Sequence, residues 1–546
     1  MTQQRQPDFG RKRSIAEALR AAEPTEPKSL SGLVARLRSL GETVDVVLPD
    51  SMSEGAETMV RGIESDSRTV TRGCLFVAIP GNRADGHRFA TDAQRAGAAA
   101  MIVEQPIPDS PIPQIVVARA RPMLAEVAAW WYDDPSREIG VVGITGTDGK
   151  TTTSFLAAAG LASAGMATGL LGTVATQIGG VREPNADHST TPESPALQRA
   201  LRAMVQAGDE AAILETTSHG LAMDRVRAID YDVAIFTNLT HEHLELHGSF
   251  EAYRSAKLRL FEGLGQPGER AKGRRSWPRI GIVNADDPAA SAFAAATTGA
   301  GARLITFGAS DHAGVRLLEV ADGPDGLRVD YDLDGKHRSV RLRLGGRFNA
   351  HNALAVAALG MGLDLDPDAV EAGMSDLQGV SGRMERVDRG QPFQVVIDYA
   401  HSPASLALVL DELGAVASAA GGEVISVFGS AGDRDREKRP MMGRIAAERS
   451  RIVILTDEDP RNEERTAILI EIAAGAATAG HQPEAILQIA DRSAAIGEAM
   501  QRARAGDVVL LAGKGHESTI EYADHDLAWN ERAEAEAALA QLGWGT

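Results

Sequence analysis

The sequence has few cysteines and no long apolar runs, and each of these absences limits the cellular compartments in which the protein is expected. Its one cysteine, Cys74, cannot form a disulfide within the chain, which favours a reducing, cytoplasmic compartment. No uninterrupted apolar stretch is long enough to span a bilayer, and the basic residues near the N-terminus are not followed by the apolar segment of a secretory signal. We therefore expect a cytoplasmic protein with no membrane insertion.

Basic residues are also scarce relative to acidic ones. The chain of 546 residues has 56 Lys and Arg against 75 Asp and Glu, which gives a formal net charge of −19. This balance argues against a dedicated binder of nucleic acid or of an anionic membrane, because both of those partners are negatively charged. The length predicts about three or four domains.

The order of apolar runs and helical segments predicts an α/β protein with three domains after a flexible extension over residues 1–30. We place the first domain at 31–118, the central domain at 119–380 and a C-terminal, Rossmann-like domain at 381–546. Alternating β-type runs and helices are typical of a mostly parallel sheet covered on both faces. The basic, glycine-containing stretch 265–279 is interpreted as a surface loop. Strands of the last two domains are predicted at 141–143, 211–215, 232–238, 281–284, 304–307, 394–397, 424–428, 452–455 and 507–511.

The stretch 138–153 reads as a nucleotide-phosphate loop. An apolar run ends at Val142, glycines surround Lys150 and Thr151, and an Ala/Leu-rich helical segment follows. Glycines let backbone N–H groups approach phosphate oxygens, the lysine adds a positive charge, and the hydroxyl can join a magnesium ion. The strict P-loop spacing asks for glycine where this chain has Ile144, so a plain strand–helix turn is the alternative interpretation.

Polar residues follow two further strands of the central domain. Glu215 ends an apolar run, where a carboxylate can hold magnesium beside phosphates; an ordinary strand-end carboxylate is the alternative. The segment 237–247 has histidines at 241, 243 and 247, which suit either a zinc site or a His/carboxylate site around Mg-ATP. The P-loop context favours the second.

Two segments can be interpreted either as ordinary structural features or as parts of a functional site. From spacing alone, Lys257 on an amphipathic helix is a surface lysine. Asn349 and Asn352 lie three residues apart at the start of a helix, where their amides can contact a base or ribose or can simply cap the helix.

The C-terminal domain has polar clusters after four predicted strands, at 398–401, 429–435, 458–463 and 513–517. Because the carboxyl ends of parallel strands meet at one edge of a sheet, these clusters should converge. Arginines and carboxylates together suit a zwitterionic, amino-acid-like ligand.

Together these motifs resemble those of the Mur ligase family, and within it the MurE type. The resemblance covers about residues 60–530 and includes Asp66-Ser67-Arg68, Asp85-Gly86-His87 and Thr190-Thr191-Pro192. It implies a UDP-binding domain, a central P-loop ATPase and a domain for the incoming amino acid. The implied activity joins a diamino acid to UDP-N-acetylmuramoyl-L-alanyl-D-glutamate through an acyl phosphate, in peptidoglycan synthesis. ATP as co-substrate, Mg²⁺ and a monomeric state are expected.

The resemblance also implies roles for single residues. ATP is expected at Gly146, Thr147, Asp148, Gly149, Lys150, Thr151, Thr152, Asn352, Arg383, Asp398 and His401. The UDP-linked substrate is expected at Ser67, Asn82, Thr190, Thr191, Thr217 and Arg225. The metal is expected at Thr151, Glu215, His243 and Lys257, the last modified to a carbamate. The catalytic residues are expected to be Lys150, Glu215, His243 and Lys257. The amino acid is expected at Arg434, Asp459, Arg461, Gly513 and Glu517.

Three positions depart from the family pattern. Asp148 replaces an asparagine in the phosphate loop, and Met223 stands where some members have glutamine. Glu458-Asp-Pro-Arg461 replaces the Asp-Asn-Pro-Arg of diaminopimelate users. Arg461 can pair with the distal carboxylate of meso-diaminopimelate, whereas Asp459 favours a distal ammonium. We expect meso-diaminopimelate, with lysine or ornithine as alternatives.

Other functions stay open at this point. A neighbouring ligase, such as the D-alanyl-D-alanine-adding type, disagrees with the Asp-Pro-Arg and Gly-Lys-Gly-His-Glu elements. A non-catalytic nucleotide-binding module would be expected to lack Lys150 or Lys257, and both are present. A plain P-loop hydrolase would turn over ATP without any amino acid.

Overall fold

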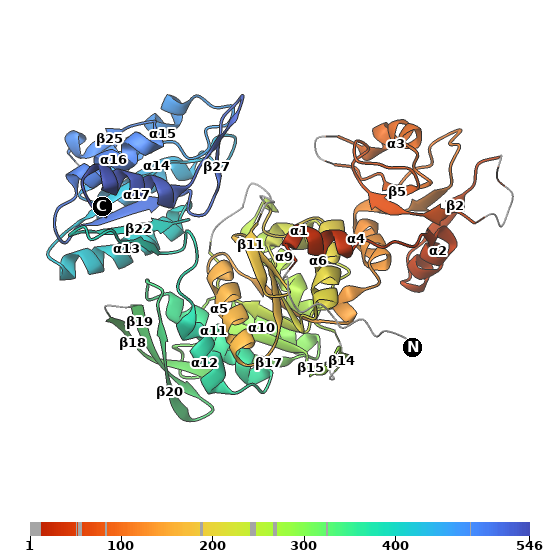
Figure 1. Cartoon of the computed structure of the whole chain (residues 1–546), viewed down its shortest axis with the longest axis horizontal. Coiled ribbons are helices and arrows are strands. Elements are labelled where there is room, and N and C mark those ends of the chain that lie inside the picture. Colours follow the sequence, from red (N-terminus) through yellow and green to blue (C-terminus); the bar gives the residue numbers. More distant parts are fainter. Residues whose placement is uncertain are drawn as a thin grey trace, which may run out of the picture.

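The computed structural model describes residues 13–50, 52, 57–81, 84–185, 189–240, 247–265, 270–323, 326–480 and 482–545. Three α/β units follow one another along the chain, each around its own sheet. Figure 1 shows the first and third units at opposite ends of the molecule, with the second between them. The three-domain α/β architecture with a mostly parallel central sheet is therefore confirmed.

The N-terminal unit is a five-stranded sheet in the order β2-β7-β6-β5-β4, parallel except for the edge strand β2. Helices α2 and α4 cover one face, and α3 packs beside the other. The elements are β1 (Lys28–Ser29), α2 (Leu30–Ser39), β2 (Val44–Val47), β3 (Met59–Val60), β4 (Gly62–Glu64), β5 (Cys74–Val77), α3 (Ala90–Ala96), β6 (Ala100–Val103), β7 (Gln114–Val117) and α4 (Ala120–Trp131). Cys74, the single cysteine, is buried in this unit.

The central unit is an eleven-stranded sheet whose middle, from β9 through β12, β8, β13 and β16 to β17, is parallel. Antiparallel β10 and β11 extend one edge. At the other edge β18 still runs parallel to β17, and β19 and β20 follow as antiparallel strands. The strands are β8 (Gly140–Thr145), β9 (Thr168–Leu171), β10 (Ala175–Ile178), β11 (Val181–Pro184), β12 (Ala211–Glu215), β13 (Val233–Phe236), β16 (Ile280–Asn284), β17 (Arg303–Gly308), β18 (Val315–Gly323), β19 (Gly326–Leu333) and β20 (Lys336–Leu342).

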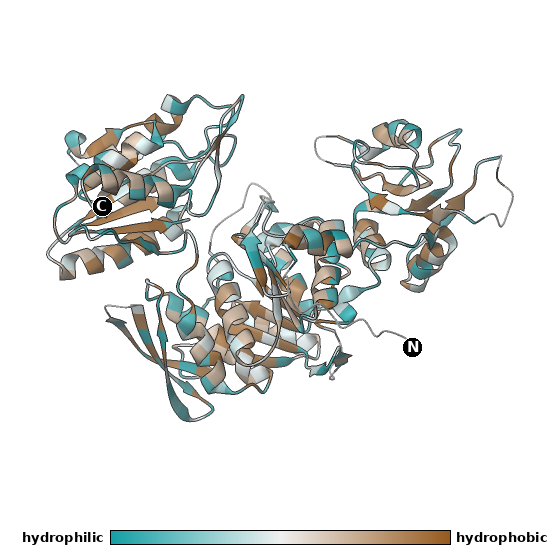
Figure 2. Cartoon of the chain, viewed as in Figure 1, coloured by the Kyte–Doolittle hydropathy of each residue, from teal (hydrophilic) through white to brown (hydrophobic). Residues whose placement is uncertain are grey.

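Helices bury both faces of the central sheet, which explains why its middle strands are apolar throughout rather than alternating. One core contains residues of α5, α11 and α12, and the other contains residues of α6, α9 and α10. Figure 2 shows these apolar strands inside the molecule and polar residues on the outer helix surfaces. The helices are α5 (Lys150–Ser163), α6 (Ser194–Ala207), α7 (Ser218–Ala222), α9 (Phe250–Glu262), α10 (Ala290–Gly299), α11 (Asn349–Gly362) and α12 (Pro367–Asp376).

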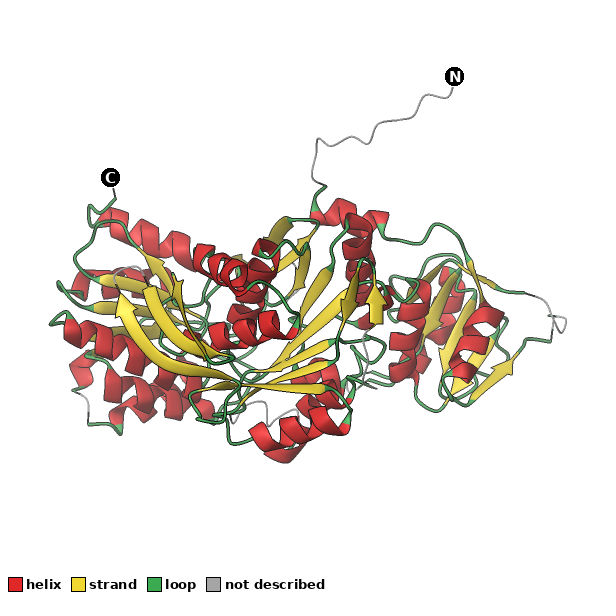
Figure 3. Ribbon diagram, turned by 90° about the horizontal axis from the view of Figure 1, so that it is seen from below, coloured by secondary structure: helices red, strands yellow, loops and turns green. Residues whose placement is uncertain are grey.

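The C-terminal unit has six strands in the order β21-β22-β26-β23-β24-β25, parallel except for β21. Helices again cover both faces, as the view in Figure 3 shows. The elements are β21 (Glu385–Val387), β22 (Gln394–Asp398), α13 (Pro403–Ala419), β23 (Val424–Phe428), α14 (Lys438–Arg449), β24 (Ile452–Leu455), α15 (Arg465–Ala477), β25 (Ile486–Gln488), α16 (Arg492–Arg502), β26 (Val508–Ala512), β27 (Thr519–Glu521), β28 (Asp526–Ala528) and α17 (Glu531–Gln541).

The expected flexible extension over 1–30 is wrong for its described part. Helix α1 (Ile15–Ala21) begins with a capping box between Ser14 and Glu17, which satisfies backbone N–H groups at the helix start. Ile15 is buried in the same core as α6, and its backbone N–H donates to Glu183 on β11. The segment is therefore a part of the central domain contributed from the N-terminus; residues 1–12 lie outside the described range.

The interpretation of 265–279 as a surface loop is also wrong for its described part. Strands β14 (Arg270–Lys272) and β15 (Arg275–Trp277) form a hairpin whose Trp277 indole lies against Gly140. The side chains of Lys272 and Arg279 are buried, and the carboxylate of Asp232 accepts hydrogen bonds from them at 2.6 and 3.2 Å. Buried charges need such partners, and here the partner lies some forty residues away in the sequence.

In the described part of the chain, no helix has the length and apolarity needed to cross a membrane.

Candidate functional site

The phosphate loop joins β8 to α5 and depends on two glycines. Gly146 has φ +156°, and a Cβ there would lie 1.8 Å from Thr237 Oγ1. Gly149 has φ +83°, and its Cβ would lie 2.6 Å from Asn352 Oδ1. These approaches and the positive φ angles leave no room for a side chain at either position. Without side chains there, a phosphate can approach the backbone N–H groups at the start of α5. The P-loop interpretation holds despite Ile144, because this loop turns on Gly146 instead.

Two lysines converge on this loop. Lys150 Nζ donates to Gly146 O at 2.9 Å and to Thr147 O at 2.7 Å, and Lys257 Nζ donates to Gly146 O at 2.7 Å. Lys257 is only 1% exposed, and its Nζ lies 4.6 Å from the ring of Tyr253. The bland interpretation of Lys257 as a surface lysine is therefore wrong, since α9 turns this side chain into the site.

A buried carboxylate lies at the end of β12 beside the loop. Glu215 Oε2 accepts hydrogen bonds from Thr151 Oγ1 at 2.9 Å and from Thr173 Oγ1 at 2.8 Å, and its Oε1 accepts from the Thr173 N–H at 3.0 Å. A carboxylate and a threonine hydroxyl at the foot of a phosphate loop form a suitable donor set for a hard cation such as Mg²⁺. His243, the third expected protein ligand, lies outside the described residues.

The zinc alternative finds no support in the described residues. Of its three histidines only His247 is described, and its Nε2 lies 3.1 Å from Ser218 Oγ. Within the described ranges no three His, Cys, Asp or Glu side chains are grouped so as to hold a metal ion.

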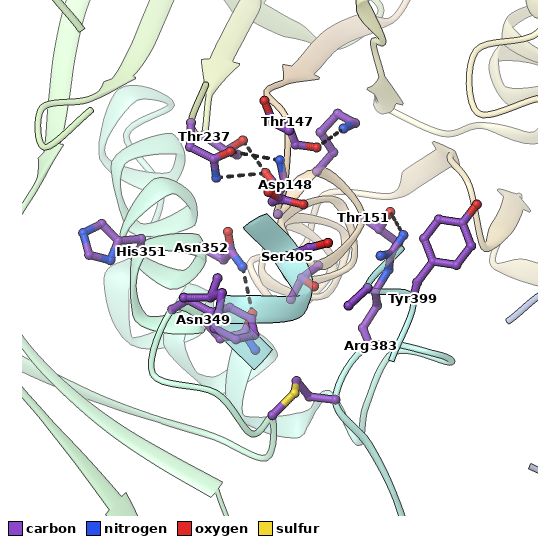
Figure 4. Close-up of a pocket in the computed structure, with 18 of the residues that line it drawn as sticks. Thr147, Asp148, Thr151, Thr237, Asn349, His351, Asn352, Arg383, Tyr399 and Ser405 are labelled. Carbon is purple, nitrogen blue, oxygen red and sulfur yellow. Dashed lines mark hydrogen bonds between the residues drawn. The ribbon is translucent and has the colours of Figure 1, made fainter. Parts of the chain in front are cut away.

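A cavity of about 410 Å³ opens between the phosphate loop and the C-terminal unit. Figure 4 shows side chains from α5, α11 and the β22 end pointing into it. All the residues expected to bind ATP line this cavity except Gly146, which lies in the loop just behind it. Sequence reasoning did not single out the apolar side of the cavity, because those residues come from four separate segments and share no motif: Phe307, Phe348, Met384, Leu408 and Val409.

The two asparagines at the start of α11 face the phosphate loop. Asn352 Nδ2 donates to Asn349 Oδ1 at 2.7 Å, and Asn352 Oδ1 accepts from Thr153 Oγ1 at 3.1 Å. The residue in the N-cap position is Phe348, and it makes no side-chain cap. The capping alternative is therefore wrong: the buried amides tie α11 to α5 and line the cavity.

Arg383 links the C-terminal unit to the phosphate loop. Its guanidinium lies over the Tyr399 ring at 4.7 Å, and its Nη2 lies 3.4 Å from Thr151 Oγ1 (Figure 4). Beside it, burial raises the pKa of Asp398, while the positive charge of Arg383 opposes that rise. Asp398 accepts the backbone N–H groups of Met384 and Ala400 at 2.8 and 2.9 Å, which fixes the connection between the two units.

Thr190 and Thr217 line the cavity on the β12 side, and Thr191 and Arg225 lie beside them. Thr191 Oγ1 and Thr217 Oγ1 are 3.0 Å apart, Thr190 Oγ1 lies 3.0 Å from Thr173 Oγ1, and Arg225 Nη1 donates to Thr191 O at 2.8 Å. The structure thus groups these residues expected to hold the substrate. Ser67 lies apart from them, after β4 of the N-terminal unit, and Asn82 is outside the described residues.

The four polar clusters of the C-terminal unit meet at one sheet edge, as predicted. Lys514 Nζ lies 2.7 Å from Asp459 Oδ1 and 2.6 Å from Glu517 Oε2. Arg461 Nε donates to Glu521 Oε2 at 2.7 Å, and the Gly432 N–H donates to Asp459 O at 2.8 Å. We refer to this group, with Glu458 and Gly513, as the amino-acid pocket. Arg434, two residues after Gly432, has an exposed side chain.

Two features of the pocket were not foreseen. Glu458 is 6% exposed, and its Oε2 is buried without a hydrogen-bond partner in the described structure. That oxygen lies 2.9 Å from the place of a Cβ on Gly513, so only glycine fits there. Burial raises the pKa of Asp459, and Lys514 opposes the rise. A carboxylate at 458 was visible in the sequence, but its burial could not be read from spacing.

A phosphate loop facing a buried carboxylate and lysine, next to a second Rossmann-like domain with a charged pocket, defines a nucleotide-dependent enzyme that acts on two further substrates. The known proteins agree. Family models match residues 59–132 (Mur ligase family, catalytic domain), 144–360 (Mur ligase middle domain) and 382–515 (Mur ligase, glutamate ligase domain). The chain belongs to the Mur ligase family, the family of ATP-dependent ligases that its motifs resemble.

Individual relatives cover nearly the whole chain. A UDP-N-acetylmuramyl-tripeptide synthetase of Roseiflexus sp. is 44% identical over 89% of this chain and 96% of its own. A UDP-N-acetylmuramoyl-L-alanyl-D-glutamate--2,6-diaminopimelate ligase of Bacillus licheniformis is 38% identical over 88% and 95%. A solved structure of a ligase with that same name has a TM-score of 0.61 at 28% identity, over 90% of this chain and 98% of its own.

Proposed function

We propose that this chain is a UDP-N-acetylmuramoyl-L-alanyl-D-glutamate:meso-diaminopimelate ligase, which forms an amide bond at the expense of ATP. The observation that carries the proposal is the cavity between the phosphate loop and the C-terminal unit, with Arg383 reaching across to Thr151. Relatives that bear this ligase name at 36–39% identity support the choice of substrates. Lysine and ornithine are the alternatives for the amino acid.

The three units receive separate roles in this proposal. The N-terminal unit, from residue 31 to the end of α4 at Trp131, binds the UDP moiety, with Ser67 and Asn82 at the uridine. The central unit, up to residue 380, binds ATP and the muramoyl dipeptide, and residues 381–546 bind the diamino acid. We propose that the protein works as a monomer in the cytoplasm; the single cysteine fits the reducing compartment. Light scattering of the purified protein tests the monomeric state.

The first chemical step activates a carboxylate. The γ-carboxylate of the substrate's D-glutamate attacks the γ-phosphorus of ATP, the bond from that phosphorus to the bridging oxygen breaks, and an acyl phosphate and ADP result. Negative charge spreads over the phosphoryl oxygens during this transfer. The N–H groups at the start of α5 and the ammonium of Lys150 lie where they can stabilise that charge.

Mg²⁺ would neutralise phosphate charge at Thr151 and Glu215. Lys257 fits the same site only if its charge changes sign: its amine attacks CO₂, loses one proton and becomes an anionic carbamate. Its burial at the loop is consistent with a lysine that does not work as a solvated cation. ¹³C NMR of the protein in ¹³CO₂-saturated buffer should show a carbamate resonance that is absent from Lys257→Ala.

The second step forms the amide. The free amine of the diamino acid attacks the acyl carbon, a tetrahedral intermediate forms, and inorganic phosphate leaves as the amine loses a proton. The amino-acid pocket holds this substrate through its α-carboxylate and distal groups. Glu517 of this pocket accepts a hydrogen bond at 3.0 Å from the hydroxyl of Tyr399, which lines the cavity, so the pocket can direct the amine toward the acyl phosphate.

Phosphate release tests the proposal. Mg-ATP, the UDP-linked dipeptide and diaminopimelate are mixed with the enzyme, and each is omitted in turn. We expect release only with all three. Release that needs only ATP would indicate a plain hydrolase, and no release with diaminopimelate, lysine or ornithine would reject the ligase. Lys336→Ala, an exposed lysine on β20, serves as the matched control for Lys150→Ala.

A further inference from the structure

Arg461 is already paired within the protein. Its Nε donates to Glu521 Oε2 at 2.7 Å, its Nη1 donates to Gly432 O at 3.2 Å, and its Nη2 lies 3.9 Å from Asp459 Oδ2. Glu521 belongs to the β27–β28 hairpin, about sixty residues further along the chain. The arginine that should receive a distal carboxylate therefore has a carboxylate of the protein beside it.

The backbone holds Glu521 in this place. The Arg461 N–H donates to Glu521 O at 3.0 Å, and the Glu521 N–H donates to Asp459 Oδ1 at 3.0 Å. The next residue, Tyr522, donates its hydroxyl to the buried Asp457 at 3.0 Å, and the Arg465 guanidinium lies 5.4 Å from its ring. These contacts fix the hairpin on both sides of Glu521. The backbone therefore holds the Glu521 side chain next to Arg461.

The pocket as a whole has more carboxylates than cations. Lys514 is shared between Asp459 and Glu517, Arg461 is paired with Glu521, and Glu458 adds a buried carboxylate whose Oε2 has no hydrogen-bond partner in the described structure. An incoming distal carboxylate must either displace Glu521 from Arg461 or bind next to it. Both arrangements bring like charges together, which weakens binding. A distal ammonium meets no such penalty.

We propose that Glu521 is a specificity-determining residue: its carboxylate competes with the distal carboxylate of the diamino acid for Arg461 and so lowers the preference for diaminopimelate over ornithine and lysine. This inference rests on the proposed function. Glu521 acts through the charge of Arg461 and takes no part in the chemistry.

The substitution Glu521→Gln tests this role, because glutamine keeps the size and the hydrogen-bond acceptor and removes the charge. The matched control is Asp526→Asn, which removes one charge from the exposed residue directly across the same hairpin. We would measure kcat/KM for diaminopimelate, and the affinity for ornithine either as a substrate or as a competitor of diaminopimelate.

We expect Glu521→Gln to raise the ratio of diaminopimelate to ornithine affinity roughly 10-fold, on the scale of one charge-assisted hydrogen bond. The two ligands should move in opposite directions, whereas a merely loosened hairpin would weaken both. An unchanged ratio, an equal loss for both ligands, or the same shift in Asp526→Asn would overturn the inference and leave the ligase intact. A wild-type enzyme that turns over no diamino acid would overturn the proposed function itself.

Discussion

The phosphate loop and the amino-acid pocket hold their cations in different ways. At the phosphate loop, Lys150 and Lys257 donate to backbone carbonyls of Gly146 and Thr147. In the amino-acid pocket, Arg461 and Lys514 are paired with carboxylates. A phosphate displaces a neutral carbonyl easily, because the lysine gains a charged partner. A ligand carboxylate gains far less where it replaces another carboxylate.

This difference suits the two ligands. Every cycle uses the same triphosphate, so the loop can attract anions without discrimination. Under the proposed function, the pocket has to choose among diamino acids that differ in one distal carboxylate, and cations already paired with acids respond to small differences in ligand charge. We therefore propose that the loop provides affinity for the triphosphate and that the pocket provides selection among diamino acids.

The largest expected effect comes from the loop. Lys150→Ala removes a charge that stabilises the transferring phosphoryl group, and we expect kcat/KM for ATP to fall about 1,000-fold. Steady-state phosphate release measures this. Lys336→Ala should keep wild-type rates; an equal loss in both variants would show that the effect is not local to the loop.

Thermal or urea unfolding should show that removing a lysine costs more stability in the amino-acid pocket than at the phosphate loop. Lys514→Met removes the nearer cation from the buried Asp459 and leaves only the Arg461 guanidinium 3.9 Å away, and we expect a loss of about 3–5 kcal/mol in the free energy of unfolding. Lys150→Met removes only contacts to carbonyls at a cavity, and we expect a change within about 0.5 kcal/mol. Equal losses in the two variants would contradict the distinction between charged and neutral partners.

Arg461→Lys keeps the charge of the pocket but loses the planar guanidinium. We expect KM for diaminopimelate to rise roughly 10-fold with kcat little changed, because lysine cannot form a forked pair with a carboxylate. Initial rates at varied diaminopimelate measure this, with KM for ATP as the internal control. A rise in both KM values would mean that Arg461 supports the fold rather than the amino acid.

The smallest effect concerns a buried carboxylate that has no ion pair with any residue the structure describes. Burial raises the pKa of Asp209 to about 6 from its ordinary value of 3.8, and the Gly179 N–H only partly opposes this. The stability that its protonated form contributes is complete below pH 3.8 and is lost as the pH rises through about 6. We expect the free energy of unfolding of Asp209→Asn to be about 1–2 kcal/mol higher than that of the wild type at pH 7 and equal to it at pH 4. Urea titrations at both pH values decide this; a gain of equal size at pH 4 would contradict the burial argument.

Contiguous features of the molecule could be predicted from the sequence. The phosphate loop lies within one run of residues, and the buried strands at 211–215, 424–428 and 452–455 have the predicted bounds, because an apolar run between polar turns marks a covered parallel strand. The convergence of the four C-terminal clusters followed from sheet geometry alone.

Features that depend on distant partners could not be predicted. From the sequence, the hairpin at 270–277 looks like a solvated basic loop, because nothing nearby in the sequence indicates that Asp232 pairs with Lys272. Glu521 has no spacing that relates it to Arg461, since a separate hairpin brings the two together. Helix α1 did carry a local signal, the capping box at Ser14 and Glu17, which the polar composition around it obscured.

The most direct test offers diaminopimelate, lysine and ornithine together, with Mg-ATP and the UDP-linked dipeptide, and weighs the nucleotide product by mass spectrometry. The account predicts one new nucleotide, heavier than the dipeptide nucleotide by a diaminopimelate residue. A product that carries lysine or ornithine would contradict the choice of amino acid. An unchanged dipeptide nucleotide, with or without phosphate release, would contradict the ligase.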